Sequence, residues 1–389
     1  MQERADVRPG GALAGSTAAA LTDVSIFRAA AGVRHRVGVE IAGCRYPISP
    51  VSAGFLSLRA DLFPAAHDVA TDALGMGRPV VLSGDGAEAA ARLTAAVGGS
   101  RWIRAHGREE VHFVVPARFV RDRAAALGRR LPRRPPRPDA PHQHLTAVGV
   151  GPRPLGTQAE ILGVLDRAEA VVATDWTYAN TLPRLLGAPL PRGPGRHVVP
   201  YDITDYDATI SGVDDVLTAL QGSGVREVAL LVEGNPDTYD VLDGVRLDRR
   251  RLHVVPGVPI ALVAAAEFGA RLTPSPFASQ LAYLSGLPLR HEQTPAELRV
   301  ELSRYLAAGV SCVLVEMTFG DLGLAVQAAR AAGPPKVLAL LTDRYSPDAR
   351  EMVASAASPD QTRALLEQAK GTLSTLLIFD APAGGGGGG

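Results

Sequence analysis

The stretch VGVGPRPLG, residues 148–156, combines the end of a strand-like run with three glycines and two prolines. Two phosphate-binding loops begin in a similar way. The dinucleotide fingerprint G-x-G-x-x-G, counted from Gly149 and Gly151, requires a third glycine where the chain has Pro154. The Walker loop requires a lysine where the chain has Thr157. Both interpretations are therefore excluded, and what remains is a strand followed by a rigid turn whose main chain can approach a flat ligand closely.

Strand-like and helical runs alternate over the later part of the chain. Near-continuous apolar runs of strand length lie at 145–151, 170–174, 227–234, 252–257, 311–317, 336–343 and 374–380. Helical runs separate most of them, which is the pattern of an α/β fold with largely parallel sheets that helices cover on both faces. Ligands bind beyond the carboxyl ends of the strands in such folds. Functional residues are therefore expected where these runs end.

The 389 residues are long enough for two or three domains, at a usual domain size of roughly 100–200 residues. Composition and turn signals indicate a flexible leader at 1–20, a small α/β or α+β domain at 21–128, an Arg- and Pro-rich linker at 129–143, a larger α/β domain at 144–380 and a disordered polyglycine tail at 381–389. The small domain is predicted to contain strands at 78–84 and 110–116, with a helix between them that ends in a glycine cap. Asp85 either caps the start of that helix or faces a ligand.

Charge and cysteine content narrow the classes of function. The net charge is zero, so the chain has no basic surplus with which to bind a polyanion. Its two cysteines, Cys44 and Cys312, fit neither a disulfide framework nor a zinc site. No run of about 18 apolar residues offers a membrane span. We expect a cytoplasmic protein without a nucleic-acid partner, a membrane partner or a bound metal.

Three later segments resemble the first in the way that they end strands. EGNPDTYD at 233–240 and VVPGVPIALVAAAEFG at 254–269 each place a Gly and Pro turn before a helix, and SPDAR at 346–350 precedes the last helix and strand. With VGVGPRP and with RLTPSPFASQLAYLSG at 271–286, they resemble in order and spacing the motifs of the tetrapyrrole methylase family, which include GxGPGD, GDPxxY and VPGxSxxxAAAA. The resemblance covers about residues 144–380.

The tetrapyrrole methylases are class III methyltransferases that use S-adenosylmethionine to methylate precorrins and uroporphyrinogen. The resemblance implies a homodimer whose α/β domain has two lobes, at 144–257 and 258–380, and a cofactor held mostly through main-chain groups. The matching cofactor-binding positions are Pro152, Glu233, Gly234, Asn235, Thr238, Pro259, Ile260, Met317 and Arg344. For Met317 a place in the core is the structural alternative.

The chain departs from the family motifs in three places. Arg153 and Pro154 replace Gly-Asp, Asn235 replaces Asp, and Pro259 replaces Ser or Thr. Binding of the cofactor through the main chain can survive these changes. The acceptor side of the site is expected to differ from that of a precorrin methylase.

Methyl transfer from a sulfonium is an in-line displacement, so the protein contributes mainly by aligning donor and acceptor. A general base is needed only where the acceptor atom loses a proton. The candidates in ATDWTYAN and VPYDITDYD are Asp175, Tyr178, Tyr201, Asp202 and Tyr206. Helix or turn caps and half-buried packing are the structural alternatives for these side chains.

The sequence thus predicts an S-adenosylmethionine-dependent methyltransferase that acts on a tetrapyrrole or a related small molecule. One alternative is a degenerate ligand-binding module that keeps the fold. The other is a methyltransferase with a peptide or natural-product acceptor.

Overall fold

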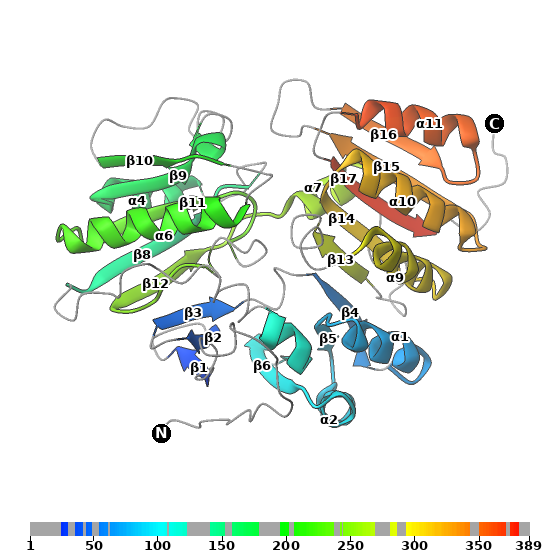
Figure 1. The fold of residues 1–389 in the computed structure, drawn as a ribbon, viewed down its shortest axis with the longest axis horizontal. Helices are drawn as coiled ribbons and strands as arrows, with labels where there is room; N and C mark the ends of the chain where they lie inside the picture. The colour runs from blue at the N-terminus through cyan, green and yellow to red at the C-terminus, as the bar shows by residue number, and fades with distance from the viewer. Residues whose placement is uncertain are drawn as a thin grey trace, which may run out of the picture. The chain divides into compact units, whose positions relative to one another are not determined.

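The computed structural model, whose fold Figure 1 shows, divides into two compact units. Unit 1 comprises Met1–Ser52 and Arg118–Pro259, and unit 2 comprises Ala53–Ala117 and Ile260–Gly389. The structure describes residues 25–29, 36–41, 44–48, 54–60, 63–106, 109–122, 141–151, 158–178, 195–201, 206–236, 242, 244–268, 281–285, 293–342, 350–370 and 374–380. The predicted leader and polyglycine tail lie outside these residues, as does the predicted linker apart from residues 141–143. None of the helices described has the length and hydrophobicity that crossing a membrane requires.

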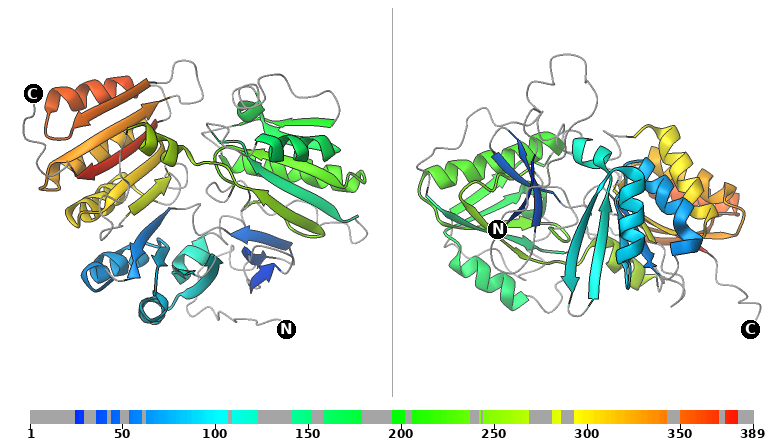
Figure 2. Two further views of the ribbon diagram at one scale, coloured as in Figure 1. Left: turned by 180° about the vertical axis from the view of Figure 1, so that it is seen from behind. Right: turned by 90° about the horizontal axis from the view of Figure 1, so that it is seen from below.

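A five-stranded parallel sheet forms the larger part of unit 1. Its strands are β8 (Gln143–Gly149), β9 (Ala170–Thr174), β10 (Gly195–Val199), β11 (Glu227–Val232) and β12 (Arg250–Val255), in the order β10-β9-β11-β8-β12. Every neighbouring pair is parallel, which confirms the prediction of a parallel sheet for this unit. Helices α4 (Gln158–Arg167) and α6 (Tyr206–Gly222) cover opposite faces (Figure 2). The carboxyl ends of all five strands therefore lie at one edge of the sheet.

The apolar pattern of the sequence accounts for the burial of this sheet. All five residues of β9 are buried. Ile161, Val164 and Leu165 of α4 recur at helical spacing and are buried in one cluster with Val171 and Leu231 of the sheet. Burial of an aliphatic side chain of this size contributes about 1.5–3 kcal/mol. The α4 face is therefore a substantial part of the core of unit 1.

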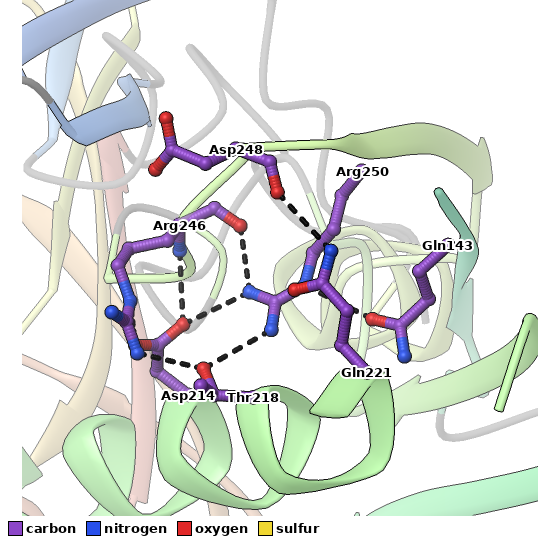
Figure 3. A network of polar contacts seen from close by, with 7 residues as sticks. All are labelled: Gln143, Asp214, Thr218, Gln221, Arg246, Asp248 and Arg250. Atoms are coloured by element: carbon purple, nitrogen blue, oxygen red, sulfur yellow. Dashed lines mark hydrogen bonds and ion pairs between the residues drawn. The ribbon is translucent and has the colours of Figure 1, made fainter. Parts of the chain in front are cut away.

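A buried network of charged and polar groups joins the amino ends of β8 and β12 to α6 (Figure 3). Asp214 of α6 accepts hydrogen bonds from Arg246 Nε at 2.6 Å and from Arg250 Nη1 at 3.1 Å. Arg250 Nε donates to Gln143 Oε1 at 3.0 Å, and Thr218 Oγ1 accepts from both arginines. Desolvation lowers the pKa of Arg250, and the charge of Asp214 opposes that shift. The network therefore joins α6 to the amino ends of β8 and β12, at the end of the sheet opposite the carboxyl ends of the strands.

Unit 2 is built on a nine-stranded mixed sheet with the order β16-β15-β17-β14-β13-β4-β5-β7-β6. Its strands are β4 (Phe55–Arg59), β5 (Val80–Ser83), β6 (Ser100–His106), β7 (Glu109–Val115), β13 (Leu281–Ser285), β14 (Ser311–Met317), β15 (Lys336–Thr342), β16 (Arg350–Ser355) and β17 (Ser374–Asp380). Its helices are α1 (Phe63–Gly75), α2 (Ala87–Val97), α7 (Ile260–Glu267), α9 (Pro295–Ala307), α10 (Phe319–Ala331) and α11 (Pro359–Gln368). The β13–β14 and β4–β5 pairs are parallel and the other described pairs are antiparallel, so this sheet is mixed where the alternation of runs predicts largely parallel strands.

The earlier part of the chain is divided between the two units, which corrects the prediction of a separate domain at 21–128. Strand β4 pairs antiparallel with β13, with Leu56 opposite Ala282, and both side chains are buried in one hydrophobic cluster. Strands β1 (Ser25–Ala29), β2 (Arg36–Ile41) and β3 (Cys44–Ile48) form a three-stranded antiparallel sheet that belongs to unit 1. The prediction failed because periodicity is a local signal, and it does not reveal which distant strand covers the edge of a sheet.

The local elements predicted inside the earlier part are confirmed as β5, α2 and β7. Helix α2 ends at Gly98, which adopts a left-handed φ of 60° and donates its N–H to the Thr94 carbonyl. The start of α2 differs from the expectation, since the N-cap residue is Gly86 and no side chain caps the helix. The predicted capping role of Asp85 is therefore wrong.

A buried ion pair joins the two parts of the chain that make unit 2. Glu301 of α9 is fully buried, and Arg78 donates to its carboxylate from Nε at 3.1 Å and from Nη2 at 3.3 Å. The Tyr305 hydroxyl and Gln293 Nε2 also donate to this carboxylate, at 2.9 Å and 2.6 Å. Burial and then the charge of Glu301 raise the pKa of Tyr305. Both carboxylate oxygens are thus hydrogen-bonded, which is the condition under which a protein interior tolerates a charge.

Replacement of Glu301 by alanine is expected to lower the free energy of unfolding of unit 2 by about 3–5 kcal/mol, since it removes the buried carboxylate that the Arg78 guanidinium faces. The chain has two tryptophans, Trp102 in unit 2 and Trp176 in unit 1. Urea unfolding followed by Trp102 fluorescence in a Trp176→Phe background therefore reports on unit 2 by itself.

The matched control for this experiment is Glu88→Ala. Glu88 pairs with Arg92 on the exposed surface of α2, and exposed pairs contribute little to stability. A loss of stability in E301A no larger than that in E88A would contradict the role assigned to the buried pair.

Candidate functional site

Three strand ends meet at the carboxyl edge of the parallel sheet in unit 1 through glycines. A Cβ atom added to Gly257 would lie 1.9 Å from the carbonyl oxygen of Gly234 and 2.7 Å from that of Gly149. A Cβ atom added to Gly149 would lie 2.4 Å from the main-chain nitrogen of Gly257. Real Cβ atoms do not make contacts this short, so this packing requires glycine at 149 and 257. We call Gly149, Gly234 and Gly257 the glycine contact.

The glycine contact brings together three of the sequence motifs. Gly149 comes from VGVGPRP, Gly234 from EGNPDTYD and Gly257 from VVPGVPIALVAAAEFG. Gly234 and Gly151 adopt left-handed φ angles of 63° and 49°, which glycine reaches without strain. The convergence of the three strand ends is thus made by main-chain atoms.

A chain of hydrogen-bonded side chains links the ends of β9 and β11. Thr177 Oγ1 donates to Glu233 Oε1 at 2.9 Å, and the hydroxyl oxygens of Thr174 and Thr177 lie 2.9 Å apart. The main-chain N–H of Thr177 also donates to Thr174 Oγ1 at 3.1 Å. Both threonines are buried, whereas Glu233 is half-buried and directly precedes Gly234. The Glu233 carboxylate is therefore held in a defined position next to the glycine contact.

Asp175 ties the end of β9 to the end of β10. Its Oδ1 atom accepts hydrogen bonds from the main-chain N–H groups of Trp176, at 2.7 Å, and of Tyr201, at 2.9 Å. The rings of Trp176 and Tyr201 lie beside each other, with centroids 6.5 Å apart and planes tilted by 43°. Asp175 thus makes the capping contacts that its structural alternative predicts, and it places two half-buried aromatic rings at the carboxyl edge.

Tyr178 packs against the α4 side of the sheet. Its ring lies against the hydrophobic cluster that contains Val148 and Leu231. Its hydroxyl accepts a hydrogen bond from Arg196 Nη1 at 2.7 Å, and the Arg196 guanidinium carbon lies 6.0 Å from the ring centroid. These contacts correspond to the half-buried packing that was the structural alternative for this tyrosine.

Two carboxylates lie among the residues that follow the described strands, and the guanidinium group of Arg196 in β10 reaches Tyr178 in the same set. Residues 150–151, 174–178, 200–201, 233–236 and 256–259 include Asp175 and Glu233 but no Lys, Arg or His. Arg153, in the first loop, lies outside the described residues. Among the residues that the structure describes, no group of three or more His, Cys, Asp and Glu side chains could hold a metal ion.

The predicted cofactor-binding residues that the structure describes fall in both units. Glu233, Gly234, Asn235 and Pro259 belong to unit 1, and Ile260 and Met317 belong to unit 2. Ile260 begins α7 and Met317 ends β14, and both side chains are buried in hydrophobic clusters. Met317 is fully buried, so its contacts match the core alternative.

The remaining predicted residues lie outside the described part of the chain. They are Pro152, Asp202, Thr238 and Arg344. The side chain of Tyr206 is also outside it, although its main chain begins α6.

Sequence reasoning passed over Thr174, Thr177 and Trp176, which the structure places around Asp175 and Glu233. The feature of the sequence that could have indicated these residues is the stretch ATDWTYAN, in which an apolar strand is followed by polar and aromatic residues. Threonine is common in strands for its β-branched shape, so its presence alone does not indicate a hydrogen-bonded link to a distant carboxylate.

Gly257→Ala is expected to lower the free energy of unfolding of unit 1 by about 2–4 kcal/mol, because the added Cβ overlaps the Gly234 carbonyl and the main chain must move. Urea unfolding followed by Trp176 fluorescence in a Trp102→Phe background measures this loss. Gly222→Ala, at the end of α6, is the control, since a Cβ there meets nothing within 4 Å. Equal unfolding curves for the two variants would refute the steric requirement at Gly257.

Asp175→Ala is expected to raise the amide hydrogen-exchange rate of Tyr201 roughly fivefold, which corresponds to a lost hydrogen bond of about 1 kcal/mol. Asp175→Asn keeps an oxygen that can accept the same N–H, so its exchange rate should stay near that of the wild type. Mass spectrometry of peptides that span 195–205 measures both rates. If the alanine variant exchanges no faster than the asparagine variant, the anchoring role is wrong.

No protein-family model matches the chain, and no curated protein matches it. Solved structures that are similar to it include the methyltransferase CobJ, with 14% identity and a TM-score of 0.44 over 61% of this chain and 95% of that one. Cobalt precorrin-4 methyltransferase CbiF has 16% identity and a TM-score of 0.44 over 60% of this chain and 94% of its own. Uroporphyrin-III C-methyltransferase from Thermus thermophilus has 20% identity and a TM-score of 0.39 over 61% of this chain and 92% of its own. The similarity thus covers nearly all of each of these chains, at low sequence identity.

Proposed function

We propose that this chain is an S-adenosylmethionine-dependent methyltransferase of the tetrapyrrole methylase family, which methylates a tetrapyrrole or a related small molecule. The glycine contact is the observation that supports the proposal. Gly149, Gly234 and Gly257 each come from one of the motifs on which the sequence resemblance rests, and they lie against one another. Motifs that are distant in sequence and meet at the carboxyl edge of a parallel sheet are well placed to serve one ligand.

The residues at this edge fit a ligand that is held through the main chain. Gly149 and Gly257 let the three strand ends approach one another, so the peptide groups that an adenosyl group would contact at this edge come from all three motifs. The departures from the family motifs are compatible with such binding. Asn235 keeps a hydrogen-bonding side chain, and Pro259 keeps its main-chain carbonyl.

The charge of the edge supports a cationic donor. A dinucleotide or a nucleoside phosphate would meet the carboxylates of Asp175 and Glu233 at the described strand ends, which would repel its negative charge. A sulfonium would instead be attracted by both carboxylates. The two carboxylates thus disfavour a phosphate ligand. The first loop does so as well, because it lacks the glycine and the lysine that the two phosphate-binding motifs require.

The chemistry would consist largely of alignment. S-adenosylmethionine supplies a methyl group on a sulfonium when it is bound. The chain would hold the donor and the acceptor in line, and such orientation lowers a barrier by up to roughly 7–11 kcal/mol. The links from Thr177 to Glu233 and from Asp175 to Tyr201 would restrict motion at the edge where this alignment takes place.

Trp176 and Tyr201 are the groups that suit a flat, conjugated acceptor. Their rings form a tilted pair, both are half-buried, and Asp175 holds the main chain of both. An aromatic pair of this kind offers apolar area at little cost in side-chain entropy. The proposal includes a homodimer in the cytoplasm, with a small-molecule acceptor and without a nucleic-acid or membrane partner.

Titration calorimetry of the full chain with S-adenosylmethionine is expected to show saturable binding at one site per chain. Gly257→Ala should weaken that binding at least tenfold, while Gly222→Ala should leave it unchanged, because only the former disturbs the convergence of the strand ends. Turnover to S-adenosylhomocysteine is then measured with tetrapyrrole, peptide and natural-product acceptors.

The outcomes of these assays separate the alternatives. No binding of S-adenosylmethionine to the intact chain would overturn the proposal. Binding without turnover for any acceptor would indicate a ligand-binding module, and turnover with a peptide or another natural product alone would replace the acceptor class.

A further inference from the structure

We propose that strand order divides the carboxyl edge of the parallel sheet between two ligands. Its β9–β10 half is an acceptor subsite for a flat, conjugated ring system, and Asp175 is the positioning residue of that subsite. The inference rests on the function proposed above and concerns the same site. It separates the residues that bind the acceptor from those that bind the methyl donor.

The strand order places glycines and aromatic rings in different halves of this edge. In the order β10-β9-β11-β8-β12, the three strands that end at the glycine contact are neighbours, and β9 and β10 form the other side of the sheet (Figure 1). Residues 174–178 and 200–201, at the ends of β9 and β10, contain no glycine but include the half-buried rings of Trp176 and Tyr201. One half of the edge therefore offers main-chain groups to a ligand, and the other half offers ring surface.

The rings of Trp176 and Tyr201 form one packed unit, which we call the aromatic pair. Their centroids lie 6.5 Å apart and their planes are tilted by 43°. This separation is within the range at which aromatic rings attract each other. Because the planes are tilted, a flat ligand that stacks on one ring meets the other ring with its edge, and both arrangements are favourable for a conjugated ring system. A flexible chain without rings gains neither contact.

Asp175 sets the position of one ring relative to the other. Its Oδ1 atom accepts the main-chain N–H of Trp176 at 2.7 Å and that of Tyr201 at 2.9 Å, so a single oxygen holds the main chain of both members of the aromatic pair. The second of these bonds crosses from the end of β9 to the end of β10, between residues 26 positions apart. Asp175 thus acts on a ligand through the rings that it holds.

Two buried threonines attach this half of the edge to the other. Thr174 and Thr177 are 8% and 2% exposed, and their hydroxyl oxygens lie 2.9 Å apart. Thr177 Oγ1 also donates to Glu233 Oε1 at 2.9 Å, which joins the segment after β9 to the end of β11. The acceptor subsite and the glycine contact are therefore held at a fixed separation, as an in-line transfer between two ligands requires.

The test compares two dissociation constants in each variant. The constant for S-adenosylmethionine is measured by calorimetry, and that for uroporphyrin, a stable and flat tetrapyrrole, by titration of its Soret absorbance. Trp176→Leu removes one ring of the aromatic pair, so the constant for uroporphyrin should rise about tenfold while that for S-adenosylmethionine stays within about twofold. The unchanged binding of S-adenosylmethionine also shows that the variant is folded.

Variants of Asp175 test the positioning role. Asp175→Ala should raise the constant for uroporphyrin about fivefold, because the rings lose their common anchor. Asp175→Asn should restore binding, since its side-chain oxygen can accept the same two N–H groups. With an acceptor that is turned over, Asp175→Ala should raise KM and leave kcat within about twofold. A general base at this position would instead lose kcat in both variants.

Asp215→Ala is the matched control. Asp215 is an exposed aspartate of α6 in the same unit, so this variant also loses a carboxylate, on a helix and not at the strand ends. Both of its constants should equal those of the wild type.

Several outcomes would overturn the inference while leaving the proposed function intact. They are a wild type that binds S-adenosylmethionine but not uroporphyrin, unchanged uroporphyrin binding in Trp176→Leu, equal weakening of both ligands, and the same loss in Asp215→Ala as in Asp175→Ala. Binding of uroporphyrin in Asp175→Asn that is as weak as in Asp175→Ala would overturn the positioning role. If S-adenosylmethionine does not bind the wild type, the proposed function itself fails.

Discussion

The contact between Gly149, Gly234 and Gly257 is the constraint on which the candidate site depends. Three parallel strands can bring their carboxyl ends into van der Waals contact only where no Cβ atom stands between them. This requirement explains why glycine occurs at positions 149 and 257, and the left-handed φ of 63° explains it at position 234. The contact between the strand ends is made by main-chain atoms. Charge and aromatic surface come from neighbouring side chains, which are Asp175, Glu233, Trp176 and Tyr201.

The parallel sheet of unit 1 has a different chemical character at each edge. At the amino ends of the strands, the buried carboxylate of Asp214 accepts hydrogen bonds from the guanidinium groups of both Arg246 and Arg250. At the carboxyl edge, Asp175 and Glu233 face described strand ends that include no basic residue. Buried charges that are hydrogen-bonded to one another join neighbouring elements, whereas the half-buried Glu233 follows the carboxyl end of β11, the end of a parallel strand beyond which ligands bind in such sheets.

Prediction from the sequence was most reliable for single elements. Runs such as 170–174 and 227–234 became β9 and β11 because their continuous apolar character demands burial on both faces. Prediction was weakest where two distant segments had to be matched. The pairing of β4 with β13 and the ion pair between Arg78 and Glu301 join residues more than two hundred positions apart, and neither leaves a periodic signal. The link from Thr177 to Glu233 was missed for the same reason.

The sequence by itself determined the α/β class, the positions of the strand ends, the exclusion of the two phosphate-binding loops, and the resemblance to the tetrapyrrole methylases. These follow from local spacing and from residue types at turns, which the amino-acid order contains directly. Only the tertiary structure decided that the earlier part of the chain is shared between two units, that Asp175 anchors Tyr201, and that Glu233 lies beside the glycine contact. Those outcomes depend on which surfaces bury each other, and burial is a property of the folded chain as a whole.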